Sequence, residues 1–100
     1  MNQQQIMKLR KMQKQMMEAQ EKLEQTVFTG TAGGGVVTAE VKGNHEVVAI
    51  HIDPEALEDD LEMVQDMIVL AINDAGKKVE EESNKLLGGF GGMGMGGFGF

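Results

Sequence analysis

Residues 2–26 contain no glycine or proline and belong to the longest such stretch of this 100-residue chain. Most of its residues are Gln, Lys, Met, Glu and Leu, which are good helix formers. Its apolar side chains recur every seven residues in two rows, Leu9, Met16 and Leu23, and Met12, Ala19 and the weaker Thr26. This spacing predicts a helix of about 25 residues with a narrow apolar seam, suited to coiled-coil packing.

The same helix gathers positive charge at its start. Residues 1–17 contain Lys8, Arg10, Lys11 and Lys14 and no acidic residue, although the whole chain has a formal net charge of −7. In the heptad register these four side chains face away from the seam. The pattern alone leaves two alternatives, a solvated helix face and a surface that binds a polyanion.

The acidic residues of the chain need not cancel this basic cluster. Residues 53–66 hold seven acidic residues and no basic one. If the helix projects outward, Lys8 lies roughly 27 Å along it from Thr26, well beyond the Debye length of about 8 Å in the cell. Nucleic acid or an anionic membrane is then the natural target. The seam lacks the Trp and Phe of an interfacial helix, which disfavours the membrane.

Residues 27–52 change to β-branched chemistry. "VFTGT" is followed by the flexible break "AGGG", and then by "VVTAEVK" and "HEVVAIHI" on either side of Gly43-Asn44. That dipeptide favours a two-residue hairpin loop. The loop would pair Val41 with Glu46, Ala39 with Val48 and Val37 with Ile50. We therefore expect a three-stranded antiparallel meander with one buried face.

A short helical turn and a long helix are expected after the sheet. Asp53 can cap the turn and Pro54 suits its first position. Asp59 and Glu62 resemble a capping box for a helix over about 60–87. One apolar stripe of that helix suits the sheet: Leu61, Val64, Ile68, Ile72, Ala75 and Val79. A second stripe, Met63, Met67 and Leu70, is best covered by the same helix of a second subunit, which predicts a homodimer.

Residues 1–87 therefore form one predicted α+β domain. Residues 88–100 contain eight glycines among thirteen residues, carry no charge, and are expected to be a disordered Gly/Phe/Met-rich tail. The sequence lacks Cys, Tyr and Trp, and its one serine, Ser83, lies among glutamates. We expect a non-enzyme without catalytic residues, metal site, cofactor or small-molecule substrate. No apolar run approaches the ~20 residues of a membrane span, which favours a cytoplasmic protein.

At the level of motifs the sequence resembles the YbaB/EbfC family of nucleoid-associated proteins. The resemblance covers about residues 5–88 and rests on "GTAGGGVVTAEVKGNHEVVAIHIDPEALEDD" and "INDAGKKVEEES". It implies the order αβββα, a homodimer whose helices project from a joined sheet, and a location in the nucleoid. It also implies binding of double-stranded DNA, compaction of the nucleoid and, in some members, effects on gene expression.

The resemblance also directs attention to particular residues. The long helices of the family contact DNA, especially the first, which points to Lys8, Arg10, Lys11 and Lys14. Lys22 is a weaker candidate, as are Lys77, Lys78 and Lys85. The alternative is a coiled-coil adaptor, in which the seam binds a helix of another protein and the charges only confer solubility.

Overall fold

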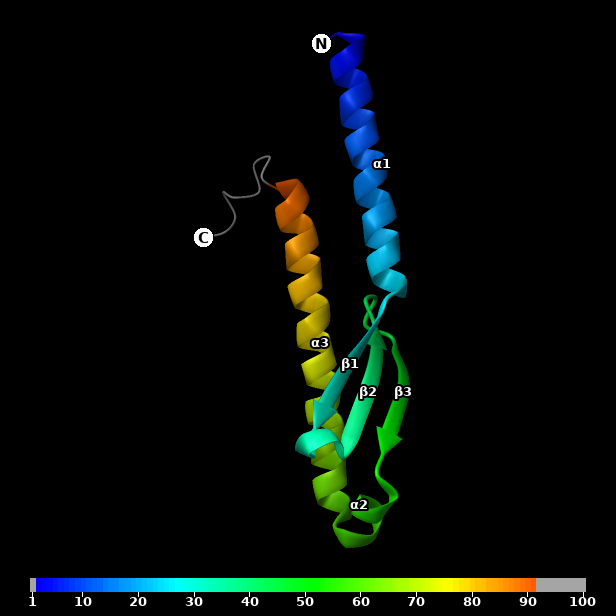
Figure 1. Cartoon of the computed structure of the whole chain (residues 1–100), viewed down its shortest axis with the longest axis vertical. Coiled ribbons are helices and arrows are strands. Elements are labelled where there is room, and N and C mark those ends of the chain that lie inside the picture. The colour runs from blue at the N-terminus through cyan, green and yellow to red at the C-terminus, as the bar shows by residue number, and fades with distance from the viewer. Residues whose placement is uncertain (1, 92–100) are drawn as a thin grey trace.

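The computed structural model describes residues 2–91. Two long helices and a three-stranded sheet account for most of them (Figure 1). The elements in chain order are α1 Gln3–Gln25, β1 Val27–Ala32, the 3-10 turn η1 Gly33–Gly35, β2 Val37–Lys42, β3 Val47–Ile52, α2 Pro54–Asp59 and α3 Leu61–Gly91. This order confirms the predicted αβββα arrangement.

The sheet has the strand order β1-β2-β3, and both pairs of neighbours are antiparallel. Helix α3 covers one face of it, mainly over β1 and β2. The core lies between them and is built from small residues: Ala32, Val37, Ala39, Val41, Val64, Ala71, Ala75 and Val79. The predicted sheet-facing stripe of α3 is therefore correct except at Leu61, which is exposed at the first position of the helix.

Small residues at this interface let the helix approach the sheet closely. Gly30 in β1 is buried, and a Cβ atom placed on it would overlap the backbone carbonyl oxygen of Ala71 and the backbone nitrogen of Ala75. Both atoms belong to the α3 backbone and cannot rotate away. The distance between helix and sheet is thus set by the absence of a side chain at Gly30.

The turn between β1 and β2 depends on glycine for a different reason. Gly33, Gly34 and Gly35 all have positive φ, at 62°, 70° and 102°. Residues with a Cβ atom rarely adopt this conformation, so three successive glycines allow a compact reversal here. The predicted break at "AGGG" is therefore a defined turn.

The predicted register of the second hairpin is wrong by two residues. Ala39 pairs with Ile50 and Val37 with Ile52, and a bulge interrupts the ladder between Glu40 and Val41. Four residues, 43–46, separate β2 from β3 instead of two, and among them His45 has a positive φ of 70° and its N–H donates to the Lys42 carbonyl at 2.8 Å. A shift of two residues keeps the same side chains on the buried face, so the prediction of which side chains form the apolar face remains correct.

Polar side chains define the beginnings of the helices. Asn2 and Gln5 form a capping box at α1, and Asp53 accepts from the Glu55 N–H at 3.0 Å at α2. The predicted cap of α3 at Asp59 is wrong by one residue, since Asp59 ends α2 and the Asp60 carboxylate accepts from the Met63 N–H at 3.2 Å. Helix α3 continues four residues past its predicted end at 87, to Gly91. Residues 92–100 of the predicted tail lie outside the described residues.

Candidate nucleic-acid interface

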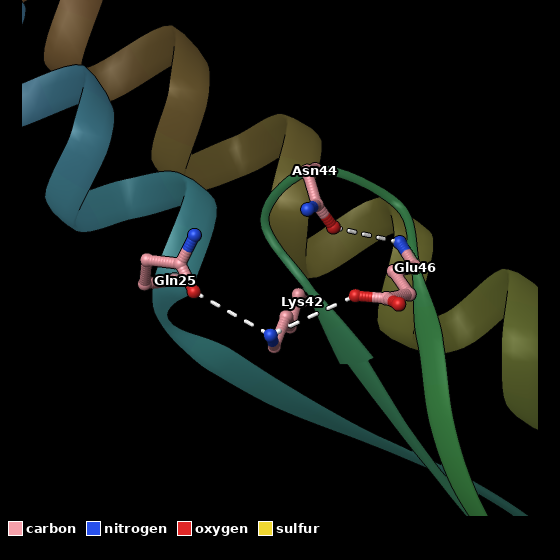
Figure 2. A network of polar contacts seen from close by, with 4 residues as sticks. All are labelled: Gln25, Lys42, Asn44 and Glu46. Carbon is pink, nitrogen blue, oxygen red and sulfur yellow. Dashed lines mark hydrogen bonds and ion pairs between the residues drawn. The ribbon is translucent and has the colours of Figure 1, made fainter.

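The last turn of α1 is fixed to the β2–β3 hairpin. The Lys42 ammonium lies 3.4 Å from the Gln25 amide oxygen and 3.6 Å from the Glu46 carboxylate, and the Asn44 side chain closes the loop by accepting from the Glu46 N–H (Figure 2). The Gly43 N–H donates to the Thr26 carbonyl at 2.9 Å. These contacts join three segments at one point, which sets the direction in which α1 leaves the sheet.

Beyond this joint α1 projects away from the sheet, and its first residues form one end of the molecule (Figure 1). The molecule is 68 Å along its longest axis, and α2 lies at the end opposite to the start of α1. The acidic segment 53–66 covers α2 and the beginning of α3. The basic and acidic segments are therefore separated by several Debye lengths, so salt screens the acidic residues from the start of α1.

The four basic side chains near the start of α1 form a surface that we call the basic tip: Lys8, Arg10, Lys11 and Lys14. All four are exposed, whereas Met12 and Met16 on the seam are half-buried. Within residues 2–91 none of the four takes part in an ion pair. The first turn of α1 also lacks an acidic residue, so no negative charge there offsets these cations. The tip presents exposed cations that can bind anions.

The weaker candidates are placed differently from one another. The Lys78 ammonium donates to the Thr29 carbonyl at 2.5 Å, and the neighbouring Asp74 carboxylate accepts from the Thr31 N–H at 3.0 Å. These two side chains of α3 satisfy the open edge of β1, so Lys78 is a structural residue. No local pattern predicts this role, because Lys78 and Thr29 lie 49 residues apart in the chain.

The other lysines differ in whether they form an ion pair. Lys85 forms an ion pair with Glu82 at 3.2 Å. Lys22 lies in the last turn of α1, far from the basic tip, and both Lys22 and Lys77 are exposed without an ion pair in the described part of the chain. The structure therefore brings four of the five predicted nucleic-acid-binding residues together and leaves Lys22 near the joint.

The predicted dimer residues on α3 are not equivalent. Met63 and Leu70 are 52 % and 59 % exposed, whereas Met67 is half-buried and packs against the core of its own chain. Met63 and Leu70 are seven residues apart and so lie on one side of the helix. They leave an uncovered apolar strip beside the sheet.

Other kinds of site find little support in residues 2–91. No three His, Cys, Asp or Glu side chains there are grouped so that they could hold a metal ion. None of the described helices has the length and apolar character needed to cross a membrane.

The fold and this surface define a class of small α+β proteins in which a long basic helix projects from a helix-covered antiparallel sheet. The sequence model of the YbaB/EbfC DNA-binding family matches residues 1–95. The chain belongs to this family. The family binds DNA and is not an enzyme family, which confirms the expectation of a non-enzyme.

Individual relatives agree with this assignment. A nucleoid-associated protein of Chloroflexus aurantiacus is 46 % identical over 99 residues, which cover 93 % of this chain and 99 % of the relative. One from Rhodococcus jostii is 47 % identical over 89 residues, covering 84 % and 79 % of the two chains. The crystal structure of the uncharacterized protein HP0035 from Helicobacter pylori has a similar fold, with a TM-score of 0.63 and 37 % identity over 78 % of this chain and 92 % of that one.

Proposed function

We propose that this protein binds double-stranded DNA in the nucleoid through the basic tip of α1. The observation that carries the proposal is the combination of four exposed, unpaired cations at one end of the molecule with all the acids of segment 53–66 at the other. Membership of a DNA-binding family selects DNA among the polyanions that such a tip attracts. Nucleoid organisation follows if two tips hold one duplex or join two, and bound protein would also affect expression of the DNA that it covers.

The mechanism is mainly electrostatic. Lysine and arginine side chains that contact phosphates release condensed counterions, so the affinity falls as the salt concentration rises. Side chains of Gln3, Gln4, Gln5 and Arg10 could also read base edges if the helix enters a major groove. The phosphate contacts would still supply most of the affinity for random sequences.

Titration of a random-sequence duplex across salt tests this function. We expect the logarithm of the binding constant to fall linearly with the logarithm of salt between about 50 and 300 mM, with a slope of about −7 if a dimer makes eight phosphate contacts and roughly −3.6 if it makes four. Fluorescence anisotropy of labelled DNA measures the binding constant at each salt concentration. A slope near zero, or no binding at low salt, would contradict the proposal.

We further propose that the protein acts as a homodimer, because the exposed strip at Met63 and Leu70 is apolar and borders the sheet. Leu70→Glu should place a charge inside the interface and convert the dimer into a folded monomer. Sedimentation velocity measures the mass and circular dichroism the helix content. Val69→Glu is the matched control, since Val69 is 57 % exposed but points about 100° away around α3. A wild-type monomer at micromolar concentration would contradict the homodimer.

One observation favours an adaptor as the second candidate function. No residue of α1 is buried, so its seam remains open to a helix of another protein. Reversing the charges of the basic tip would spare such binding while it removes binding to DNA. A variant that keeps its DNA affinity after charge reversal would contradict the electrostatic mechanism in favour of another DNA-binding surface.

A further inference from the structure

A groove of about 600 Å³ with a partly apolar lining lies between the second half of α1 and the last turns of α3. Ala19 and Leu23 of α1 line one wall, Leu86 of α3 lines the other, and Phe28 at the start of β1 lies between the helices. Lys22 and Lys85 also line it. At this level α1 and the end of α3 run side by side, and α1 continues beyond the point where α3 ends (Figure 1).

The groove leaves apolar side chains incompletely covered by the described residues. Phe28 is on the face of β1 that carries the buried Gly30 and Ala32, yet it is only half-buried. Leu23 and Leu86 are half-buried as well. A large aromatic and two leucines around a concavity favour an apolar occupant that completes their burial.

We propose that the C-terminal segment 96–100 of the same chain docks in this groove, with Phe98 and Phe100 as its anchors. Gly91 is five positions after Leu86, so the end of the described helix lies about 7.5 Å along α3 from this residue of the groove. The nine residues that follow can span up to about 30 Å. A reversal over residues 92–95 therefore leaves enough chain to return to Phe28.

The chemistry of the segment fits the groove. Residues 88–100 carry no charged side chain, so Lys22, Lys85 and Glu82 at the groove do not oppose their entry. The glycines permit the reversal, and the two phenylalanines supply the aromatic surface that Phe28 and the leucines lack. A short tether keeps the segment at millimolar effective concentration, which favours the same chain over a molecule outside the dimer at micromolar concentration. The inference does not depend on DNA binding.

A single tryptophan in the full chain tests the docking, because the protein contains no Trp or Tyr. In Phe98→Trp we expect blue-shifted emission and several-fold weaker quenching by acrylamide than in the control Met93→Trp, which precedes the proposed docking segment in the sequence. Equal, solvent-like behaviour of the two tryptophans would overturn the proposal. Protection should not change across a hundredfold range of protein concentration; protection that appears only at high concentration would assign the groove to a second copy and also overturn it.

Groove variants in the Phe98→Trp background locate the binding site. Leu86→Glu should expose the tryptophan, whereas Val69→Glu, the same kind of change about 25 Å away along α3, should not. If circular dichroism shows that Leu86→Glu unfolds the protein, Ala19→Gln replaces it, because a long polar side chain would fill the groove without a large loss of helix propensity. Protection that survives in a folded groove variant would place the segment elsewhere and overturn the proposal.

Discussion

Replacing Lys8, Arg10, Lys11 and Lys14 together by glutamine is expected to abolish DNA binding at physiological salt. Glutamine keeps the helix propensity and removes only the charge. If the dimer uses eight tip charges, the slope of log affinity against log salt should rise from about −7 to near zero. Proteins with this number of phosphate contacts lose about 10³-fold or more in affinity between 50 and 200 mM salt, and we expect the variant to lose at least as much at low salt. Anisotropy titrations measure both quantities.

A two-charge comparison provides the control for this result. Lys8→Gln with Lys11→Gln removes two cations of the tip that form no ion pair within residues 2–91, and Lys77→Gln with Lys85→Gln removes two cations of α3, of which Lys85 is paired with Glu82. The net charge is the same in both variants. If the affinity depends on the tip, only the first pair should flatten the salt slope. Equal effects of the two pairs would show that the net charge, and not the tip, governs binding.

The largest effect on stability is expected from Gly30→Ala. The new methyl group would overlap the α3 backbone at Ala71 and Ala75, so the helix must move away from the sheet. Overpacking a core costs typically 1–3 kcal/mol, and we expect about 3 kcal/mol or more because the obstructing atoms belong to backbone. Urea unfolding at fixed protein concentration measures the change as a lower midpoint with an unchanged slope.

Gly76→Ala is the matched substitution within α3, about 100° around the helix from Ala75. No atom lies within 4 Å of a Cβ placed on Gly76, and the residue is in the interior of α3. Alanine should therefore raise the free energy of unfolding by up to about 1 kcal/mol through helix propensity alone. A similar loss at both positions would contradict the steric explanation for Gly30.

The helices, strands and buried faces could be predicted because each follows from a period in the local sequence. The seven-residue repeat of α1 and the alternation around Val37 and Ala39 require no knowledge of the remaining chain. The hairpin register could not be predicted in this way. It depends on His45 adopting a positive φ and on the side chain of Asn44, whereas Gly43-Asn44 suits a shorter loop equally well.

In the candidate site, too, some features could be predicted from the sequence and others could not. The basic tip is predicted from four cations with no acid before Glu18, and within residues 2–91 all four are exposed and outside ion pairs. The roles of Lys42 and Lys78 were missed, because both depend on groups distant in sequence. Lys42 reaches Gln25, and Lys78 reaches the carbonyl of Thr29. No periodic pattern connects such pairs, so only the folded chain reveals them.

A rotation at the joint between α1 and the β2–β3 hairpin would displace each residue of α1 in proportion to its distance from the joint. Gln25 lies at the joint, and Lys8 is seventeen residues, or about 26 Å, away from it along α1. A rotation of about 10° at the joint would move the tip by about 4.5 Å over this distance, a large part of the roughly 6 Å width of a DNA minor groove. The few contacts around Lys42 and Gly43 therefore determine where the basic tip lies relative to the sheet, although these residues are far from the tip.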